Sequence, residues 1–163
     1  MTHAPTLVAA QRVVAVGGAL TVPYIAVKTY WASGGRAGLS DGYDLAGEFT
    51  KNGAPDALVW LERHGVDFTA VLALTGLIAA STLVRPWARR LPRRLLLVPA
   101  CAATLLVSYG LLTAVTAISE DGGHAETPIT GWIVPAGVCA FLGIGTALGA
   151  GAWSRLYRRT GAD

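Results

Sequence analysis

The sequence has few charged residues and few cysteines, and it lacks the common catalytic motifs. Only 14% of its 163 residues are charged, whereas about a quarter is usual in a soluble domain. Its two cysteines, Cys101 and Cys139, stand in separate apolar segments without a C-x-x-C motif, so we expect buried side chains rather than a disulfide or redox pair. The nucleophile elbow G-x-S-x-G, the phosphate-binding P-loop and histidine pairs at metal-ligand spacing are missing. We therefore predict no metal site and no cofactor.

Hydrophobic residues make up 53% of the chain and are concentrated in four long blocks, at about 7–31, 66–84, 95–118 and 129–154. At about 1.5 Å per helical residue, each block covers the hydrocarbon core of a bilayer, which is about 30 Å thick. Backbone groups in that core must be hydrogen-bonded within the protein, and blocks of this length favour helices over barrel strands. The predicted fold is all-α, a four-helix transmembrane bundle that forms one integral membrane domain over residues 1–163.

The first loop, residues 32–63, is predicted to be partly helical. Residues 43–50 are weakly amphipathic, and residues 55–63 begin with a proline followed by an acid, as many helices do. The second piece either lies on the membrane interface or extends the next span outward.

The positive charges indicate the orientation. Arginines gather in the turn at 85–94 and near the C-terminus at 155–159, whereas nine of the ten acidic residues fall in or next to the other two loops. The positive-inside rule then places both termini in the cytoplasm and the first loop outside, in a multi-pass protein of the cell membrane. We expect the basic residues to contact membrane lipids, and the net charge of +3 does not indicate nucleic acid as a partner.

Small residues recur along the fourth block at the spacing that lets transmembrane helices approach closely. They favour packing inside one bundle; the alternative is a seam for a homo-oligomer or a partner membrane protein. The residues are Gly143, Gly145, Ala147, Gly149 and Gly151.

Ionisable residues within apolar blocks are functional candidates, because charge is costly in a membrane. Arg12 lies near the cytoplasmic boundary and can reach lipid phosphates. Lys28 and Asp67 lie at matching depths near the outer boundary, and we predict that they approach each other across the first two spans. The pair is either a structural ion pair or an acid/base pair, and Glu120 is a further acid/base candidate. Alternatively, Lys28 reaches the interface alone.

Other polar and aromatic side chains are predicted at the same level and suggest a ligand site. His64 joins Asp67 on one face only if a helix runs unbroken through Gly65. Trp31 also suits an interfacial anchor. The predicted ligand-binding residues are Tyr24, Lys28, Tyr30, Trp31, His64, Asp67 and Tyr109.

The segment 23–39, P-Y-I-A-V-K-T-Y-W-A-S-G-G-R-A-G-L, resembles a pattern in small four-span membrane proteins of high-GC Gram-positive bacteria, grouped as domains of unknown function. The shared element is a basic residue followed by Tyr-Trp-Ala and two glycines. The matching residues here are Lys28, Tyr30, Trp31, Ala32, Gly34 and Gly35. The resemblance implies a bacterial four-span protein and implies no activity.

Three functions fit these features. The first is a protein that binds a lipid or a partner through an outer-leaflet cavity and the first loop. The second is a small membrane enzyme acting on a hydrophobic substrate, with Lys28 and Asp67 or Glu120 as acid/base groups. The third is an accessory subunit that docks on a transporter through the fourth span.

Overall fold

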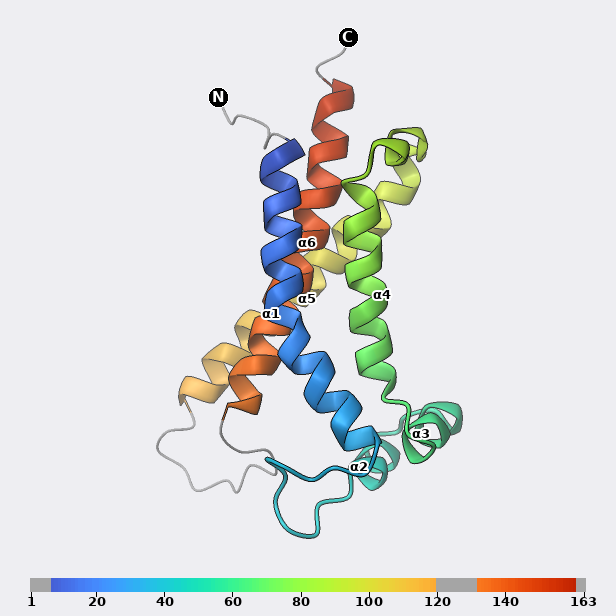
Figure 1. Cartoon of the computed structure of the whole chain (residues 1–163), viewed down its shortest axis with the longest axis vertical. Helices are drawn as coiled ribbons and strands as arrows, with labels where there is room; N and C mark the ends of the chain where they lie inside the picture. The colour runs from blue at the N-terminus through green and yellow to red at the C-terminus, as the bar shows by residue number, and fades with distance from the viewer. Residues whose placement is uncertain (1–6, 120–131, 161–163) are drawn as a thin grey trace.

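The computed structural model describes residues 7–119 and 132–160, and this part of the chain is helical without a β-strand (Figure 1). The prediction of an all-α fold is confirmed for these residues. The helices are α1 (Leu7–Ala32), α2 (Leu45–Lys51), α3 (Asp56–Arg63), α4 (Phe68–Leu83), the short 3-10 helix η1 (Pro86–Arg90), α5 (Arg93–Ser119) and α6 (Ile133–Thr160).

Three of these helices, α1, α5 and α6, are long and apolar enough to cross a membrane, which fits a multi-pass membrane protein. The second predicted block, 66–84, forms α4, whose 16 residues span about 24 Å. This helix qualifies as a span only together with α3, from which it is bent by 96°. Gly65, with a φ of 83°, lies in the turn between them. The bend shows that residues 55–63 do not extend the second span outward along its axis.

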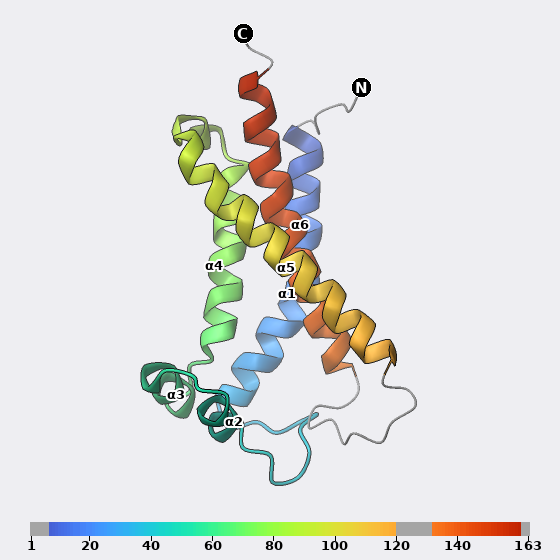
Figure 2. The same ribbon diagram turned by 180° about the vertical axis from the view of Figure 1, so that it is seen from behind.

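The long helices are arranged around α6. It packs against α1, α5 and α4, and α1 also contacts α4. Figures 1 and 2 show α5 crossing α6 obliquely, whereas α1 changes direction partway along its length. Pro23 lies within α1 and removes one helical hydrogen bond, which is a common cause of such a bend.

Glycine allows α1 and α6 to meet backbone to backbone. A Cβ added at Gly17 would lie 2.3 Å from the carbonyl oxygen of Gly143, and a Cβ at Gly143 would lie 2.7 Å from that of Gly17. Gly145 faces Ala103 and Val107 of α5 in a similar way. The small residues of α6 therefore pack inside this chain.

Further along the same helix, Gly151 faces Leu83 of α4, and Ala147 is fully buried near Gly17. Gly149 meets α5 more loosely, because its added Cβ would lie 3.5 Å from the Ala103 side chain. Successive small residues of α6 thus pack against three different helices, α1, α5 and α4.

Many large apolar side chains face outward, as expected for helices surrounded by lipid. Examples are Leu72 and Ile78 on α4 and Leu105 and Val115 on α5, all exposed. Cys101 is exposed on α5 as well, so the prediction that it is buried is wrong. The sequence marks the helix as apolar but does not show which of its faces meets α6.

Polar contacts at one end hold α4 to α6. The buried guanidinium of Arg155 donates from Nε to the Leu83 carbonyl at 2.7 Å and from a terminal nitrogen to the Arg85 carbonyl. The Leu83 carbonyl belongs to the last residue of α4, where helical partners are lacking, and Arg85 comes just before η1. The start of α1, the end of α6 and η1 lie at this end of the molecule, and α2 and α3 lie at the opposite end (Figure 1).

The Gly17 contact predicts a large difference between two adjacent substitutions. We expect Gly17→Ala to destabilise the protein by about 2 kcal/mol or more, because the new methyl group forces the two backbones apart. The matched control is Gly18→Ala, since a Cβ there meets nothing within 4 Å. Thermal unfolding in detergent measures both, and equal melting temperatures for the two variants would contradict the packing described.

Candidate functional site

Lys28 and Asp67 form a buried ion pair at the end of the molecule that carries α2 and α3. The Lys28 Nζ lies 2.9 Å from the Asp67 Oδ2, and the two residues are 8% and 3% exposed. Lys28 comes from the last turns of α1, and Asp67 is the residue just before α4. The approach predicted from their matching depths is therefore confirmed. The contact is an ion pair without hydrogen-bond alignment at Oδ2.

The other carboxylate oxygen of Asp67 caps α4. Its Oδ1 accepts a hydrogen bond from the backbone N–H of Ala70 at 2.8 Å and another from the Thr69 hydroxyl. The Tyr24 hydroxyl donates to the Thr69 hydroxyl oxygen at 3.0 Å. A carboxylate at this position satisfies orphan N–H groups of the helix and suits its dipole. Asp67 thus has both a structural role and an electrostatic one.

Aromatic rings enclose the ammonium group of Lys28. Its Nζ lies 5.4 Å from the ring centroid of Trp31 and 5.7 Å from that of Phe49 on α2. Phe49 in turn meets Phe68, the first residue of α4, edge to face at 5.1 Å. Cation–π attraction stabilises a partly desolvated ammonium in such surroundings. The first loop therefore folds back over the ion pair and closes it from water.

The structure brings together only part of the predicted ligand group. Tyr24, Lys28, Trp31 and Asp67 are linked by the contacts above. His64 is exposed and stacks on Trp60 at 4.0 Å, because the helix is broken at Gly65 and does not carry it to Asp67.

Of the remaining predicted residues, Tyr109 meets Tyr24 through Phe141, whose ring centroid lies 4.8 Å from that of Tyr109 and 6.0 Å from that of Tyr24. Tyr109 and Tyr30 are both exposed. Tyr30 and Trp132 line a separate shallow pocket of about 290 Å³. The third acid/base candidate, Glu120, lies outside the described residues.

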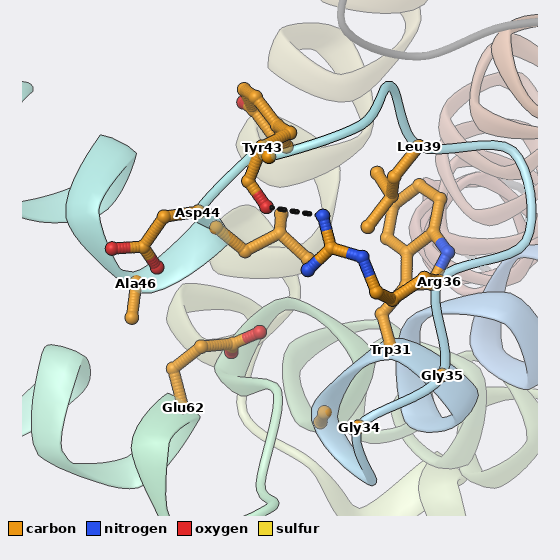
Figure 3. A pocket seen from close by; sticks show the side chains of 12 residues that line it. Trp31, Gly34, Gly35, Arg36, Leu39, Tyr43, Asp44, Ala46 and Glu62 are labelled. Atoms are coloured by element: carbon orange, nitrogen blue, oxygen red, sulfur yellow. Dashed lines mark hydrogen bonds between the residues drawn. The ribbon is translucent and has the colours of Figure 1, made fainter.

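A pocket of about 310 Å³ lies next to the ion pair, between the end of α1, the first loop and α3 (Figure 3). Trp31 connects the two, because its ring faces Lys28 and also lines the pocket. Its indole N–H donates to the Ala37 carbonyl at 2.9 Å, which holds the loop against α1. The pocket is lined by Trp31, Ala32, Gly34, Gly35, Arg36, Leu39, Gly42, Tyr43, Asp44, Leu45, Ala46 and Glu62.

Glu62 lines this pocket and was not among the ligand-binding or catalytic residues predicted from the sequence. It is 6% exposed, and neither carboxylate oxygen has a hydrogen-bond partner within the described residues. Burial, and secondarily the negative charge of Asp67, raise the pKa of Glu62 from its ordinary value of 4.5 to about 7, with Lys28 opposing the rise. Since α3 turns away from α4, this carboxyl lies outside the long helices. It can bind a proton or a cation near neutral pH.

A signal for Glu62 was present in the sequence. Within α3, Val59 and Glu62 are three residues apart and both are buried, while Trp60 and Arg63 are exposed. The acid therefore lies on the apolar face of a short amphipathic helix, where an unpaired carboxylate is costly. The sequence did not show which face of α3 turns inward.

No protein-family model, curated protein or solved structure matches the chain. The site is therefore interpreted from its own geometry.

The buried ion pair predicts strong coupling between its partners. We expect Lys28→Met to cost about 3–5 kcal/mol of stability, because it leaves Asp67 buried and unpaired, and we expect Lys28→Met/Asp67→Asn to recover most of that loss. Lys51 is the control lysine, since its pair with Glu48 is exposed, and Lys51→Met should leave the melting temperature unchanged. A double-mutant cycle from denaturant unfolding in detergent gives the coupling, and additive losses would contradict it.

The raised pKa of Glu62 predicts a pH-dependent stability. In the unfolded chain this carboxyl loses its proton near pH 4.5, and in the folded protein near pH 7, so the folded state holds more protons between these values. The contribution of Glu62 is therefore present below pH 4.5 and is lost as the pH rises to about 7, by up to about 3 kcal/mol. The measurement is the unfolding free energy of the unmodified protein minus that of Glu62→Gln at each pH. A difference that does not change over this window would contradict the burial of the carboxyl.

Proposed function

We propose that this chain is a small multi-pass membrane protein that holds the polar head of a membrane lipid in the pocket formed by α1, the first loop and α3. The observation that carries the proposal is the pocket itself. It is large enough for a head group at about 310 Å³, and its wall combines charged side chains with an aromatic ring. Ligand pockets typically pair an apolar wall with a few converging polar groups.

The position of the pocket supports a lipid ligand. It lies at the end of α1, where the apolar helix gives way to the polar first loop, and exposed aromatic side chains mark this level. Tyr30 and Trp60 are among them, and such residues are typical of the boundary between lipid tails and water. A head group at this level has its acyl chains beside the exposed apolar faces of the long helices.

The proposed arrangement in the membrane has four spans, α1, α4, α5 and α6, in a helical bundle. The arginine-rich turn at 85–94 and the C-terminal arginines lie in the cytoplasm, together with both termini. The pocket then opens at the outer face, at the end opposite η1 (Figure 1). The short helix α4 forms the second span, and α3 lies across its outer end at 96°.

A binding role is favoured over an enzyme that uses Lys28. The lysine is already paired with Asp67 and is enclosed by Trp31 and Phe49, so it is not a free acid or base. Docking of a transporter along the glycines of α6 is not supported either, because Gly143, Gly145 and Gly151 pack against α1, α5 and α4. The resemblance to uncharacterised four-span proteins stays a prediction.

The proposal predicts that lipid stays bound through detergent extraction. Native mass spectrometry of the purified protein should detect one retained lipid, and Ala46→Trp should remove it by filling the pocket. The control is Ala57→Trp, at an exposed position of α3 that does not line the pocket. Equal lipid retention in the two variants would exclude the pocket as the binding site.

A further inference from the structure

The Glu62 carboxylate points from α3 into the pocket and has no partner there (Figure 3). Both of its oxygens are shielded from solvent, and neither receives a hydrogen bond within the described residues. A buried carboxylate without donors is strongly unfavourable, so a native structure normally supplies a donor or a positive charge. A molecule bound in the pocket can supply that donor or positive charge.

The charges around Glu62 do not balance. Lys28 from α1 and Asp67 at the start of α4 face it, and these two neutralise each other. Asp44 adds a second negative side chain to the pocket wall. The buried group of one lysine and two carboxylates therefore has an excess negative charge whenever Glu62 is ionised.

The arginine in the pocket wall, Arg36, hydrogen-bonds to backbone carbonyls rather than to Glu62. The guanidinium of Arg36 donates to the backbone carbonyl of Tyr43 at 3.2 Å (Figure 3) and to that of Ser40 at 3.5 Å. Both bonds come from one of its nitrogens, whereas a guanidinium has five N–H donors. The remaining donors suit an anion such as phosphate.

The missing partner of Glu62 must be both positive and a hydrogen-bond donor. A primary ammonium meets both requirements with three N–H groups, whereas a trimethylammonium is positive but has no N–H. Trp31 in the pocket wall offers an aromatic face to such a cation. The described residues contain no group of three or more side chains suited to a metal ion. The wall therefore favours an organic amine.

We propose that the pocket binds a phosphoethanolamine-type head group, with its primary ammonium on Glu62 and its phosphate on Arg36. This assignment rests on the proposed function and names the class of lipid that the site selects. The raised pKa of Glu62 agrees with it, since an empty site holds a carboxyl that is ready to pair with a cation. The same chemistry occurs in soluble phosphoethanolamine, so the test separates the two sources.

The test compares lipid head groups on the purified full-length protein. Protein exchanged into nanodiscs of phosphatidylglycerol with equal parts of phosphatidylethanolamine and phosphatidylcholine is released into detergent, and its retained lipid is identified by native mass spectrometry. We expect phosphatidylethanolamine to exceed phosphatidylcholine at least about tenfold, because only the primary amine donates to Glu62. Glu62→Gln should remove this preference. Glu48→Gln, at a half-buried acid that pairs with Lys51 and does not line the pocket, should keep it.

A pH series keeps the assignment testable if Glu62→Gln does not fold. Retention of phosphatidylethanolamine by the unmodified protein should fall several-fold from pH 8 to pH 5.5, as Glu62 gains a proton, while the amine stays charged. The other charged groups around this site are Lys28, Asp67, Arg36 and Asp44. A preference unchanged by pH would overturn the role of Glu62.

The outcomes separate the two proposals. Lipid retained without a preference for the primary amine overturns the ammonium assignment and leaves the lipid-binding function standing. Failure to retain any of the three lipids overturns the lipid-binding function itself. Displacement of the lipid by millimolar phosphoethanolamine would assign the site to a soluble amine and overturn the lipid as its source.

Discussion

The close approach of α1 and α6 at Gly17 and Gly143 is the constraint on which the rest of the structure depends. Lipid tails are as apolar as the helices, so association relies on close van der Waals packing rather than on the hydrophobic effect. Neither crossing position has room for a Cβ, and the backbones meet directly. Because further small residues of α6 pack against α4 and α5, this one helix positions the other long helices. The direction of α1 beyond the crossing then determines where Lys28 and Trp31 lie.

At the far end of α1, an ion pair rather than close backbone packing joins this helix to its neighbour. Lys28 connects α1 to the start of α4 through Asp67, and the first loop covers the pair with Trp31 and Phe49. A buried ion pair needs further contacts to offset its desolvation, and here Asp67 Oδ1 accepts two hydrogen bonds while aromatic rings surround Lys28. Glu62 breaks this balance, because it adds a second buried carboxylate to a single lysine. The excess negative charge beside an open pocket is the feature of the fold that supports a binding function.

Much of the fold could be predicted because a membrane restricts the backbone to a few solutions. The apolar blocks become helices, and Lys28 meets Asp67, because charges at equal depth in an apolar medium are driven to pair. Other predictions depended on geometry that the sequence does not carry. His64 is separated from Asp67 by the bend at Gly65, and Cys101 faces outward because α5 packs mainly on α6.

The sequence by itself determined the helical character of the chain, the separation of its basic and acidic residues into different loops, and the two charged partners of the ion pair. These follow from composition and spacing, because hydrogen bonding and charge burial act on each segment separately. Only the tertiary structure decided that Glu62 is buried without a partner beside a pocket. Its surroundings come from the end of α1, residues 34–46 of the first loop and Asp67 at the start of α4, and the packing of α1 and α4 on α6 brings these segments together. The cost of a buried charge depends on those neighbours, and a linear sequence does not specify them.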